Sequence, residues 1–227
     1  MSLLEVRGLT KVYTRGSEEI HALRGVDITA ESGDFISIVG PSGSGKTALM
    51  NLIGCLDTPS AGQILIDGTE VSTLSEKDRV AIRRHMIGFI FQQFFLIPTM
   101  TARENIMLPL TFSRQKVDET WIDQILHMVG LSHRGCHKPH ELSGGEMQRV
   151  AIGRALVNHP RIILADEPTG NLDSETANQI YTVFHELSRQ GLTFIVVTHN
   201  AELARRSQRI ITIRDGMIHD GLVSCLK

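Results

Sequence analysis

The sequence predicts an α/β fold built around a phosphate-binding loop, with an antiparallel sheet near the N-terminus and a helical subdomain inserted further on. The loop is Gly40-Pro41-Ser42-Gly43-Ser44-Gly45-Lys46-Thr47, which fits the pattern G-x-x-x-x-G-K-[ST]. An apolar, β-branched run at 35–39 precedes it and is typical of a buried strand, and 47–53 is typical of a helix. A strand, a glycine-rich loop and a helix in this order form the setting in which the pattern binds phosphate.

Each residue type in the loop has a physical reason to be there. Glycines let successive backbone N–H groups point at one anion, and the free N–H groups at the start of the next helix add to them. Lys46 would place a positive charge against the β- and γ-phosphates, and Thr47 would offer a hydroxyl to Mg²⁺. Many loops rich in Gly and Ser are only turns, but the complete pattern in this context favours a nucleotide site.

Two strands are expected before the loop. Residues 3–13 and 20–30 are predicted to pair as antiparallel strands, and the polar segment 14–19 is predicted to be the turn between them. Tyr13 lies just before this turn. It is either an ordinary strand aromatic or a side chain that stacks on a nucleotide base, and the residues alone leave both possibilities open.

After the loop, a short strand is predicted at 63–67, a capped helix at 75–84 and another strand at 87–91. Gln92 follows the last of these, and the next segment, Phe94-Phe95-Leu96, is apolar where a connection is usually polar. These side chains either fold back into the core or form a surface for a partner.

The segment 92–160 contains little that predicts strand, so we expect a helical subdomain inserted into the α/β core. Helices are expected at 101–108 and 117–129. A further helix should begin at Ser143-Gly144-Gly145-Glu146 and end near 158, before a proline. A serine and two glycines at a helix start form a second candidate anion site, although serine is a common N-cap in any protein.

Two carboxylates follow a buried strand predicted at 162–165. Ligands collect at the carboxyl ends of strands in such sheets, so Asp166 is expected in the Mg²⁺ shell. Glu167 is expected to align or deprotonate a water molecule. A helix is predicted at 174–189, and a strand at 192–198 ends at His199. Because His199 should lie at the same sheet edge as Glu167, we expect it to contact the γ-phosphate.

Composition excludes several other classes of protein. The 227 residues carry a formal net charge of −2 with both signs interspersed, which implies no broad basic face for nucleic acid. No apolar run is long enough for a membrane helix, and the first residues do not predict a signal peptide. Cys55, Cys136 and Cys225 are far apart and form no metal-binding pattern, so we expect buried or idle thiols in a reducing compartment.

In order and spacing, these motifs resemble those of the ATP-binding subunits of ABC transporters over essentially the whole chain. The resemblance implies one domain, 1–227, with a P-loop NTPase (RecA-like) core at 1–91 and 161–227 and a helical subdomain at 92–160. The matched motifs are Walker A at 40–47, the signature at 142–146, Walker B at 162–167, the Q-loop at Gln92, the D-loop at Asp173, the H-loop at His199 and the adenine-stacking aromatic at Tyr13. ATP and Mg²⁺ are the implied ligands, with Thr47, Gln92 and Asp166 on the metal.

Residues 51–57, 92–98 and 165–173 are similar to those of the MacB- and LolD-like group. This similarity implies a cytoplasmic ATPase, peripheral on the cytoplasmic face of the cell membrane, that pairs with permeases of the FtsX type. In the family, two subunits pack head to tail and each ATP lies between the Walker A motif of one subunit and the signature of the other. The permease is expected to dock near Phe94, Phe95 and Leu96.

The chain departs from the family pattern at two positions. Its signature reads LSGGE rather than LSGGQ, and we expect little loss from this change. Ala48 follows Thr47 where the family usually has a hydroxyl, so a hydrogen bond to the α-phosphate worth about 0.5–1.5 kcal/mol would be missing. Affinity for nucleotide would then fall up to about tenfold without loss of chemistry.

The resemblance to the MacB- and LolD-like group implies that the subunit drives extrusion, of the lipoprotein-release or macrolide/peptide-export class. Two other functions are compared with extrusion. ABC proteins of DNA repair insert a long coiled coil between the Q-loop and the signature, and those of translation carry two such domains, so neither type fits this chain. An FtsE-like signalling subunit, which controls an extracytoplasmic partner without moving a substrate, remains as the alternative. The sequence identifies neither the permease nor the transported substrate.

Overall fold

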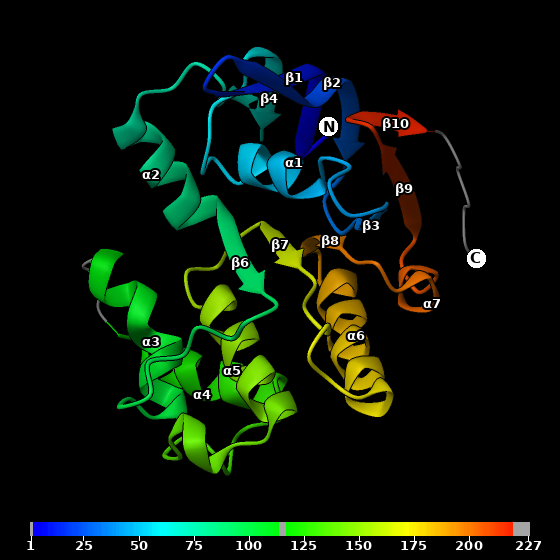
Figure 1. Cartoon of the computed structure of the whole chain (residues 1–227). Coiled ribbons are helices and arrows are strands. Elements are labelled where there is room, and N and C mark those ends of the chain that lie inside the picture. The colour runs from blue at the N-terminus through cyan, green and yellow to red at the C-terminus, as the bar shows by residue number, and fades with distance from the viewer. Residues whose placement is uncertain (1, 114–116, 220–227) are drawn as a thin grey trace.

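The computed structural model describes residues 2–113 and 117–219, and Figure 1 shows two sheets above a group of helices. The first sheet has the strand order β2-β1-β4-β5, and the second has the order β10-β9-β3-β8-β7-β6. The prediction of an α/β fold with an N-terminal antiparallel sheet is confirmed.

The first sheet is antiparallel throughout. Its strands are β1 (Leu4–Arg15), β2 (Glu18–Ala30), β4 (Ala61–Ile66) and β5 (Thr69–Glu70). The predicted turn at 14–19 was too long, because the pairing of β1 with β2 continues to Arg15 and Glu18. Gly16, at a φ of 64°, allows the chain to reverse within two residues, as a tight hairpin requires.

The second sheet carries the predicted buried strands side by side. Its members are β3 (Phe35–Val39), β6 (Ile87–Phe91), β7 (Ile162–Asp166), β8 (Thr193–Val197), β9 (Arg209–Arg214) and β10 (Met217–His219). All neighbours are parallel except β10, which pairs with β9 in the antiparallel sense. Apolar side chains cover both faces, as expected for parallel strands packed on two sides.

The predicted helices are present with small changes at their ends. They are α1 (Lys46–Ile53), α2 (Glu76–Met86), α3 (Ala102–Ser113), α4 (Glu119–Met128), α5 (Gly144–Leu156) and α6 (Ser174–Arg189), with the short helices η1 (Pro139–Glu141) and α7 (Ala201–Ala204). α3 continues past its expected end at 108 and contains Pro109. The helix continues because Ile106 and Leu110 are both buried in the helical core, and this tertiary packing stabilises a continuous helix.

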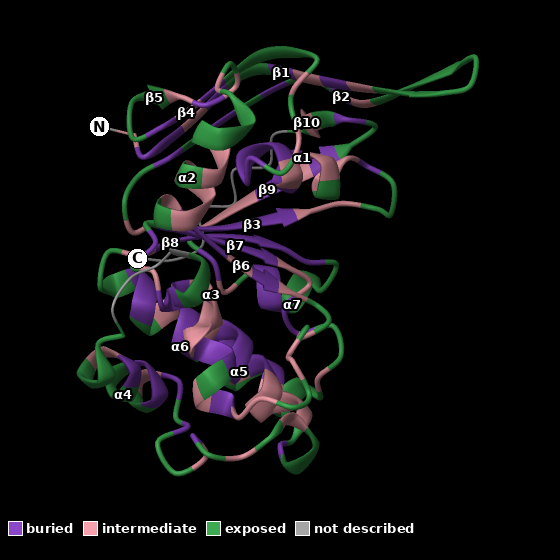
Figure 2. Ribbon diagram, turned by 90° about the vertical axis from the view of Figure 1, so that its left-hand side faces the viewer, coloured by how far each residue is buried: buried purple, intermediate pink, exposed green. Residues whose placement is uncertain are grey.

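The six-stranded sheet separates two hydrophobic cores. One core lies around α1 and the antiparallel sheet, and the other lies around α3, α4, α5 and α6. Figure 2 shows the central strands β3, β7 and β8 of the large sheet mostly in purple, which marks them as buried between the two cores. Side chains of α5 and of β6 share the second core, so the helix that begins at the signature packs directly against the six-stranded sheet.

Candidate functional site

A cavity of about 580 Å³ opens where the parallel strands β3, β6, β7 and β8 end. The carboxyl edge of a parallel sheet is the usual place for a ligand. The cavity is lined by Gly40, Ser42, Gly43, Gly45, Lys46, Thr47, Ala48, Gln92, Asp166, Glu167, Val197 and His199. The structure thus brings most of the predicted site residues together, whereas Pro41, Ser44 and Tyr13 are not among the residues that line the cavity.

The glycine-rich loop depends on close approach of the backbone. A Cβ on Gly40 would lie 2.1 Å from the carbonyl oxygen of Ile213, and one on Gly45 would lie 2.4 Å from that of Ala22. Gly45 also has a φ of 107°, which an L side chain rarely adopts. Only glycine therefore fits at these two positions, and it leaves the backbone N–H groups unobstructed.

Lys46 is held along the loop it belongs to. Its Nζ donates hydrogen bonds to the carbonyl oxygens of Gly40 and Pro41, each at 2.9 Å. The ammonium group therefore lies within the curve of the loop, beside the helix start that carries Thr47. This arrangement concentrates positive charge and backbone donors where the phosphates are expected.

Asp166, Gln92 and Thr47 offer oxygen ligands from three different elements. Burial and the nearby Glu167 charge raise the pKa of Asp166, and Lys46 acts in the opposite direction. A carboxylate that is buried beside a second carboxylate favours a neighbouring cation, so the donor set fits Mg²⁺. No group of three or more His, Cys, Asp or Glu side chains that could hold a metal occurs in the part of the chain that the structure describes. A Mg²⁺ that keeps waters and phosphate oxygens as ligands needs no such group.

Glu167 and His199 lie in direct contact. His199 Nδ1 is 2.9 Å from Glu167 Oε1, and the histidine side chain is 71% exposed while that of the glutamate is 17% exposed. Glu167 has a φ of 46°, a strained conformation for a residue with a side chain, and its N–H donates to the carbonyl oxygen of Val197. Strain of this kind is common at active sites and here fixes the carboxylate at the mouth of the cavity.

Gln92 pairs with a residue that the sequence did not single out. Gln92 Nε2 donates to Asn171 Oδ1 at 3.2 Å, and Asn171 Nδ2 donates back to the carbonyl oxygen of Gln92 at 3.1 Å. No local pattern signals this contact, because the two residues are far apart in the chain. Asn171 therefore links Gln92 to the segment that ends at Asp173.

Asp173 is the N-cap of α6. Its Oδ1 accepts from the Thr176 backbone at 2.9 Å, and the Thr176 hydroxyl donates to its Oδ2 at 2.6 Å. These hydrogen bonds from Thr176 hold the pKa of Asp173 below its usual range. The described contacts give Asp173 a helix-capping role, and its role across a dimer interface stays a prediction.

Tyr13 is anchored beside the loop that follows α1. Its hydroxyl donates to Asp57 Oδ2 at 2.9 Å, and Lys11 Nζ lies 4.7 Å from the centre of its ring. Burial, together with the Asp57 carboxylate, raises the pKa of Tyr13 to about 12. Tyr13 remains 37% exposed, and its stacking on adenine stays a prediction.

The signature begins a helix in a different part of the molecule. Ser143 is the N-cap of α5, and a separate cavity of about 340 Å³ lies beside it. A Cβ on Gly145 would lie 2.4 Å from Thr176 Cγ2, so a side chain there would force Thr176 of α6 to move. The residues that line this cavity are Gly130, Ser143, Gly145, Glu146, Arg149, Thr176 and Gln179.

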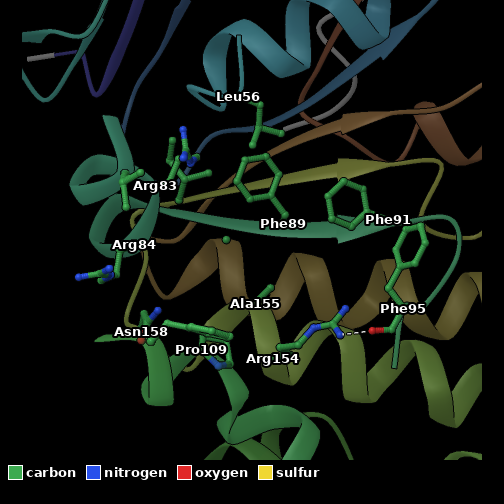
Figure 3. Close-up of a pocket in the computed structure, with 14 residues that line it drawn as sticks. Leu56, Arg83, Arg84, Phe89, Phe91, Phe95, Pro109, Arg154, Ala155 and Asn158 are labelled. Atoms are coloured by element: carbon green, nitrogen blue, oxygen red, sulfur yellow. Dashed lines mark hydrogen bonds between the residues drawn. The ribbon is translucent and has the colours of Figure 1, made fainter. Parts of the chain in front are cut away.

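The apolar loop after Gln92 divides between core and surface. Leu96 packs against the helical core, whereas Phe95 is 61% exposed and Phe94 is half-buried. Arg154 from α5 donates to the carbonyl oxygens of Phe94 and Phe95 at 2.7 and 2.6 Å. Figure 3 shows the guanidinium of Arg154 reaching the carbonyl oxygen of Phe95 while the phenyl ring stands at the edge of a groove.

That groove has a volume of about 570 Å³ and lies between the α/β core and the helices. Its apolar walls come from β6, α3 and the loop after Gln92, and Arg83, Arg84 and Arg154 stand among them (Figure 3). No acidic side chain occurs among the described residues that line it. Leu96 therefore follows the core alternative, whereas Phe95 lies at the surface, and its role as a partner surface stays a prediction.

Three further expectations concern the thiols and the membrane. Cys55 is buried, which raises the pKa of its thiol to about 11, and Cys136 is exposed. Cys225 lies outside the described residues. Across the ranges 2–113 and 117–219, none of the helices combines the length and the apolar character needed to cross a membrane.

The family model described as "ABC transporter" matches residues 23–170. The macrolide export ATP-binding/permease protein MacB of Bdellovibrio bacteriovorus is 47% identical over 216 residues, which are 95% of this chain and 33% of that protein. The lipoprotein-releasing system ATP-binding protein LolD 1 of Rhodopseudomonas palustris is 44% identical over 221 residues, which are 95% of this chain and 98% of that protein.

A solved structure, the dimeric post-hydrolysis state of the ATP-binding cassette MJ0796 bound to ADP and Pi, has a TM-score of 0.86 and 44% identity. The match covers 96% of this chain and 97% of that one. The chain thus spans 33% of the length of MacB and nearly the whole length of LolD 1 and MJ0796. The resemblance that the motifs predicted is confirmed. The chain belongs to the ABC transporter family, as an ATP-binding cassette ATPase of the MacB and LolD type.

Proposed function

We propose that this chain works as a homodimer that closes around two ATP molecules and drives extrusion by a membrane permease of the FtsX or MacB type. The proposal rests mainly on one observation: two helix N-termini that are expected to bind phosphate lie far apart within one chain. The start of α1 opens into the nucleotide cavity, and the start of α5 opens beside a second cavity. Two copies packed head to tail would bring each α5 start to the ATP of the other copy.

In this proposal the hydrolytic chemistry is performed by residues of the first cavity. The loop N–H groups and Lys46 bind and orient the β- and γ-phosphates. Glu167 accepts the proton of a water molecule that attacks the γ-phosphorus, and ADP leaves with the electrons of the broken bond. His199 holds the Glu167 carboxylate through the 2.9 Å contact and turns its exposed edge to the γ-phosphate.

Thr47, Gln92 and Asp166 are the residues that would hold Mg²⁺, which neutralises charge on the β- and γ-phosphate oxygens when bound. All three line the same cavity, which supports this assignment. Asn171 fixes the Gln92 amide at the cavity edge, so Gln92 is pre-positioned from the segment that follows Glu167.

The dimer part of the proposal is supported by two solved structures of the cassette MJ0796, both dimeric and one bound to ADP and Pi. Loss of the γ-phosphate would remove the group that joins the two subunits. Closure with ATP and opening after hydrolysis would then move a permease that each subunit carries.

The groove beside Phe95 is proposed as the docking site of the permease. Its apolar walls suit a short amphipathic helix, and buried aromatic side chains often dominate such contacts. The loop of Phe94, Phe95 and Leu96 runs from Gln92 to the helices, so the groove is connected to the nucleotide cavity by a few residues.

The signalling alternative gains no support from the relatives compared here, whose names describe macrolide export and lipoprotein release. A transport assay tests the proposal. The chain, reconstituted with its permease in vesicles, should move a cargo only with ATP, and the Glu167→Gln variant should stop the movement. ATP hydrolysis by the complex with no cargo moved would contradict extrusion.

A further inference from the structure

We propose that Arg134 neutralises the charge of Glu146 and thereby allows a carboxylate to stand in the signature without repelling the ATP phosphate of a second subunit. This inference rests on the proposed function, because it assumes that the start of α5 meets a phosphate. It assigns a positioning role to a residue outside the motifs.

Glu146 is bound entirely within its own subunit. Its Oε2 accepts the Ser143 N–H at 2.8 Å, and its Oε1 accepts the Arg134 Nε–H at 2.9 Å. The Glu146 N–H in turn donates to the Ser143 hydroxyl at 3.2 Å, which completes a reciprocal helix cap. Both carboxylate oxygens are therefore occupied, and the side chain fixes Ser143 rather than reaching outward.

The Glu146 carboxylate is charged at neutral pH. The hydrogen bond from the Ser143 backbone, assisted by the Arg134 charge, holds the pKa of Glu146 below its usual range against the opposing effect of burial. A negative charge at a helix start stabilises the helix, but it also repels an anion that approaches the same N–H groups. A glutamate at this position therefore needs a cation beside it if the helix is to receive phosphate.

Arg134 is placed to supply that cation. Its side chain is 36% exposed, and it forms the one ion pair with Glu146 in the part of the chain that the structure describes. The nearby Arg149 contacts the Val129 carbonyl oxygen and Gln179 instead. Arg134 thus offsets the Glu146 charge, whereas the Arg149 guanidinium, which lines the same cavity, is bound by Val129 and Gln179.

The Arg134 guanidinium is fixed by its own loop as well. Its Nη1 lies 3.2 Å from His137 Nε2. The carbonyl oxygens of His137 and Gly135 accept the N–H groups of Ala102 and Arg103 at 2.7 and 2.9 Å. The loop is therefore attached to the start of α3, so the cation has a defined position before any ligand arrives.

Charge compensation makes a prediction that a purely structural role does not. If Arg134 acts by neutralising Glu146, it becomes dispensable when residue 146 is neutral. Arg134→Gln retains a hydrogen-bond donor and removes the charge. Glu146→Gln removes the opposite charge and retains the shape of the cap.

The test uses the full chain with Glu167→Gln, which is expected to accumulate as an ATP-bound dimer, and measures dimerisation with Mg-ATP by sedimentation. Arg134→Gln should weaken dimerisation roughly ten- to hundredfold, because each dimer contains two such sites. Adding Glu146→Gln to Arg134→Gln should return the dimer dissociation constant to within about threefold of that of the parent. ATP binding by the monomer should be unchanged in Arg134→Gln.

Arg134→Lys keeps the charge, so its dimer dissociation constant should lie within about threefold of that of the parent. This variant replaces Arg134→Gln in the test if the glutamine variant does not fold. Arg161→Gln is the matched control, because Arg161 pairs with Asp67 on another surface. The inference is overturned if Arg134→Gln dimerises like the parent, or if the double variant stays as weak as Arg134→Gln. A parent that remains monomeric with Mg-ATP would instead contradict the proposed function.

Discussion

At the scale of single residues, the cavity holds charges that need a ligand beside them. Lys46 donates to two carbonyl oxygens of its own loop and has no carboxylate in hydrogen-bond contact among the described residues. Asp166 is half-buried beside Glu167, and both this burial and the Glu167 charge raise the pKa of Asp166. A triphosphate with Mg²⁺ satisfies both, because it brings an anion to Lys46 and a cation to Asp166.

Lys46→Ala tests the first of these charges. The variant should lose tight ATP binding, with affinity lowered at least about a hundredfold, because the charge that faces the terminal phosphates is gone. Nucleotide titration followed by fluorescence measures this directly. Lys77→Ala, at an exposed lysine of α2, is the control and should bind like the unaltered chain. An unchanged affinity in Lys46→Ala would remove the loop from the binding site.

Ala48→Thr tests the missing hydroxyl. Ala48 lines the cavity, and we expect a threonine hydroxyl at this position to reach the α-phosphate. ATP affinity should rise up to about tenfold, since one hydrogen bond is worth about 0.5–1.5 kcal/mol. Ala48→Val, which has the same shape without the hydroxyl, should give no gain. Equal affinities for the two variants would mean that the hydroxyl finds no phosphate.

At the scale of elements, the connection between the nucleotide cavity and the groove is a loop held by a helix. Arg154, in the last turn of α5, binds the carbonyl oxygens of Phe94 and Phe95, and Ser143 caps the other end of the same helix. α5 therefore contacts the loop after Gln92 at its C-terminal end and carries the signature at its N-terminal end.

Phe95→Asp tests the role of the groove. Phe95 is exposed and has a φ of 46°, a conformation that aspartate tolerates, so the lone chain should keep its ATP affinity and melt within about 4 °C of the unaltered chain. Pull-down of the permease should weaken, and ATPase activity should no longer respond to the permease. Met217→Asp, at another exposed apolar side chain, should leave both unchanged.

If Phe95 were a core residue instead, the substitution would cost roughly 3–5 kcal/mol and lower the melting temperature by many degrees. Thermal unfolding of the lone chain, measured beside the pull-down, separates the two outcomes. A large drop in melting temperature would exclude this loop from the docking surface.

At the scale of the whole molecule, the strands and motifs of the nucleotide cavity could be predicted, because apolar runs and a glycine-rich loop are local patterns. The C-terminal hairpin of β9 and β10 was not predicted, although Asp215 and Gly216 at positive φ form the usual hairpin pair between two β-branched or apolar runs. The contacts of Asn171 with Gln92 and of Arg134 with Glu146 could not be predicted. They join residues from separate elements, and only the packing of the chain brings them together.

The central claim is that ATP joins two copies of this chain, and the Glu167→Gln variant tests it most directly. The substitution keeps the shape of the side chain and removes the proton acceptor, so ATP should still bind while turnover falls at least about a hundredfold. Size-exclusion chromatography with Mg-ATP should then show a stable dimer, and the unaltered chain should be mostly monomeric without ATP. A variant that binds ATP with normal affinity but elutes as a monomer would contradict the account.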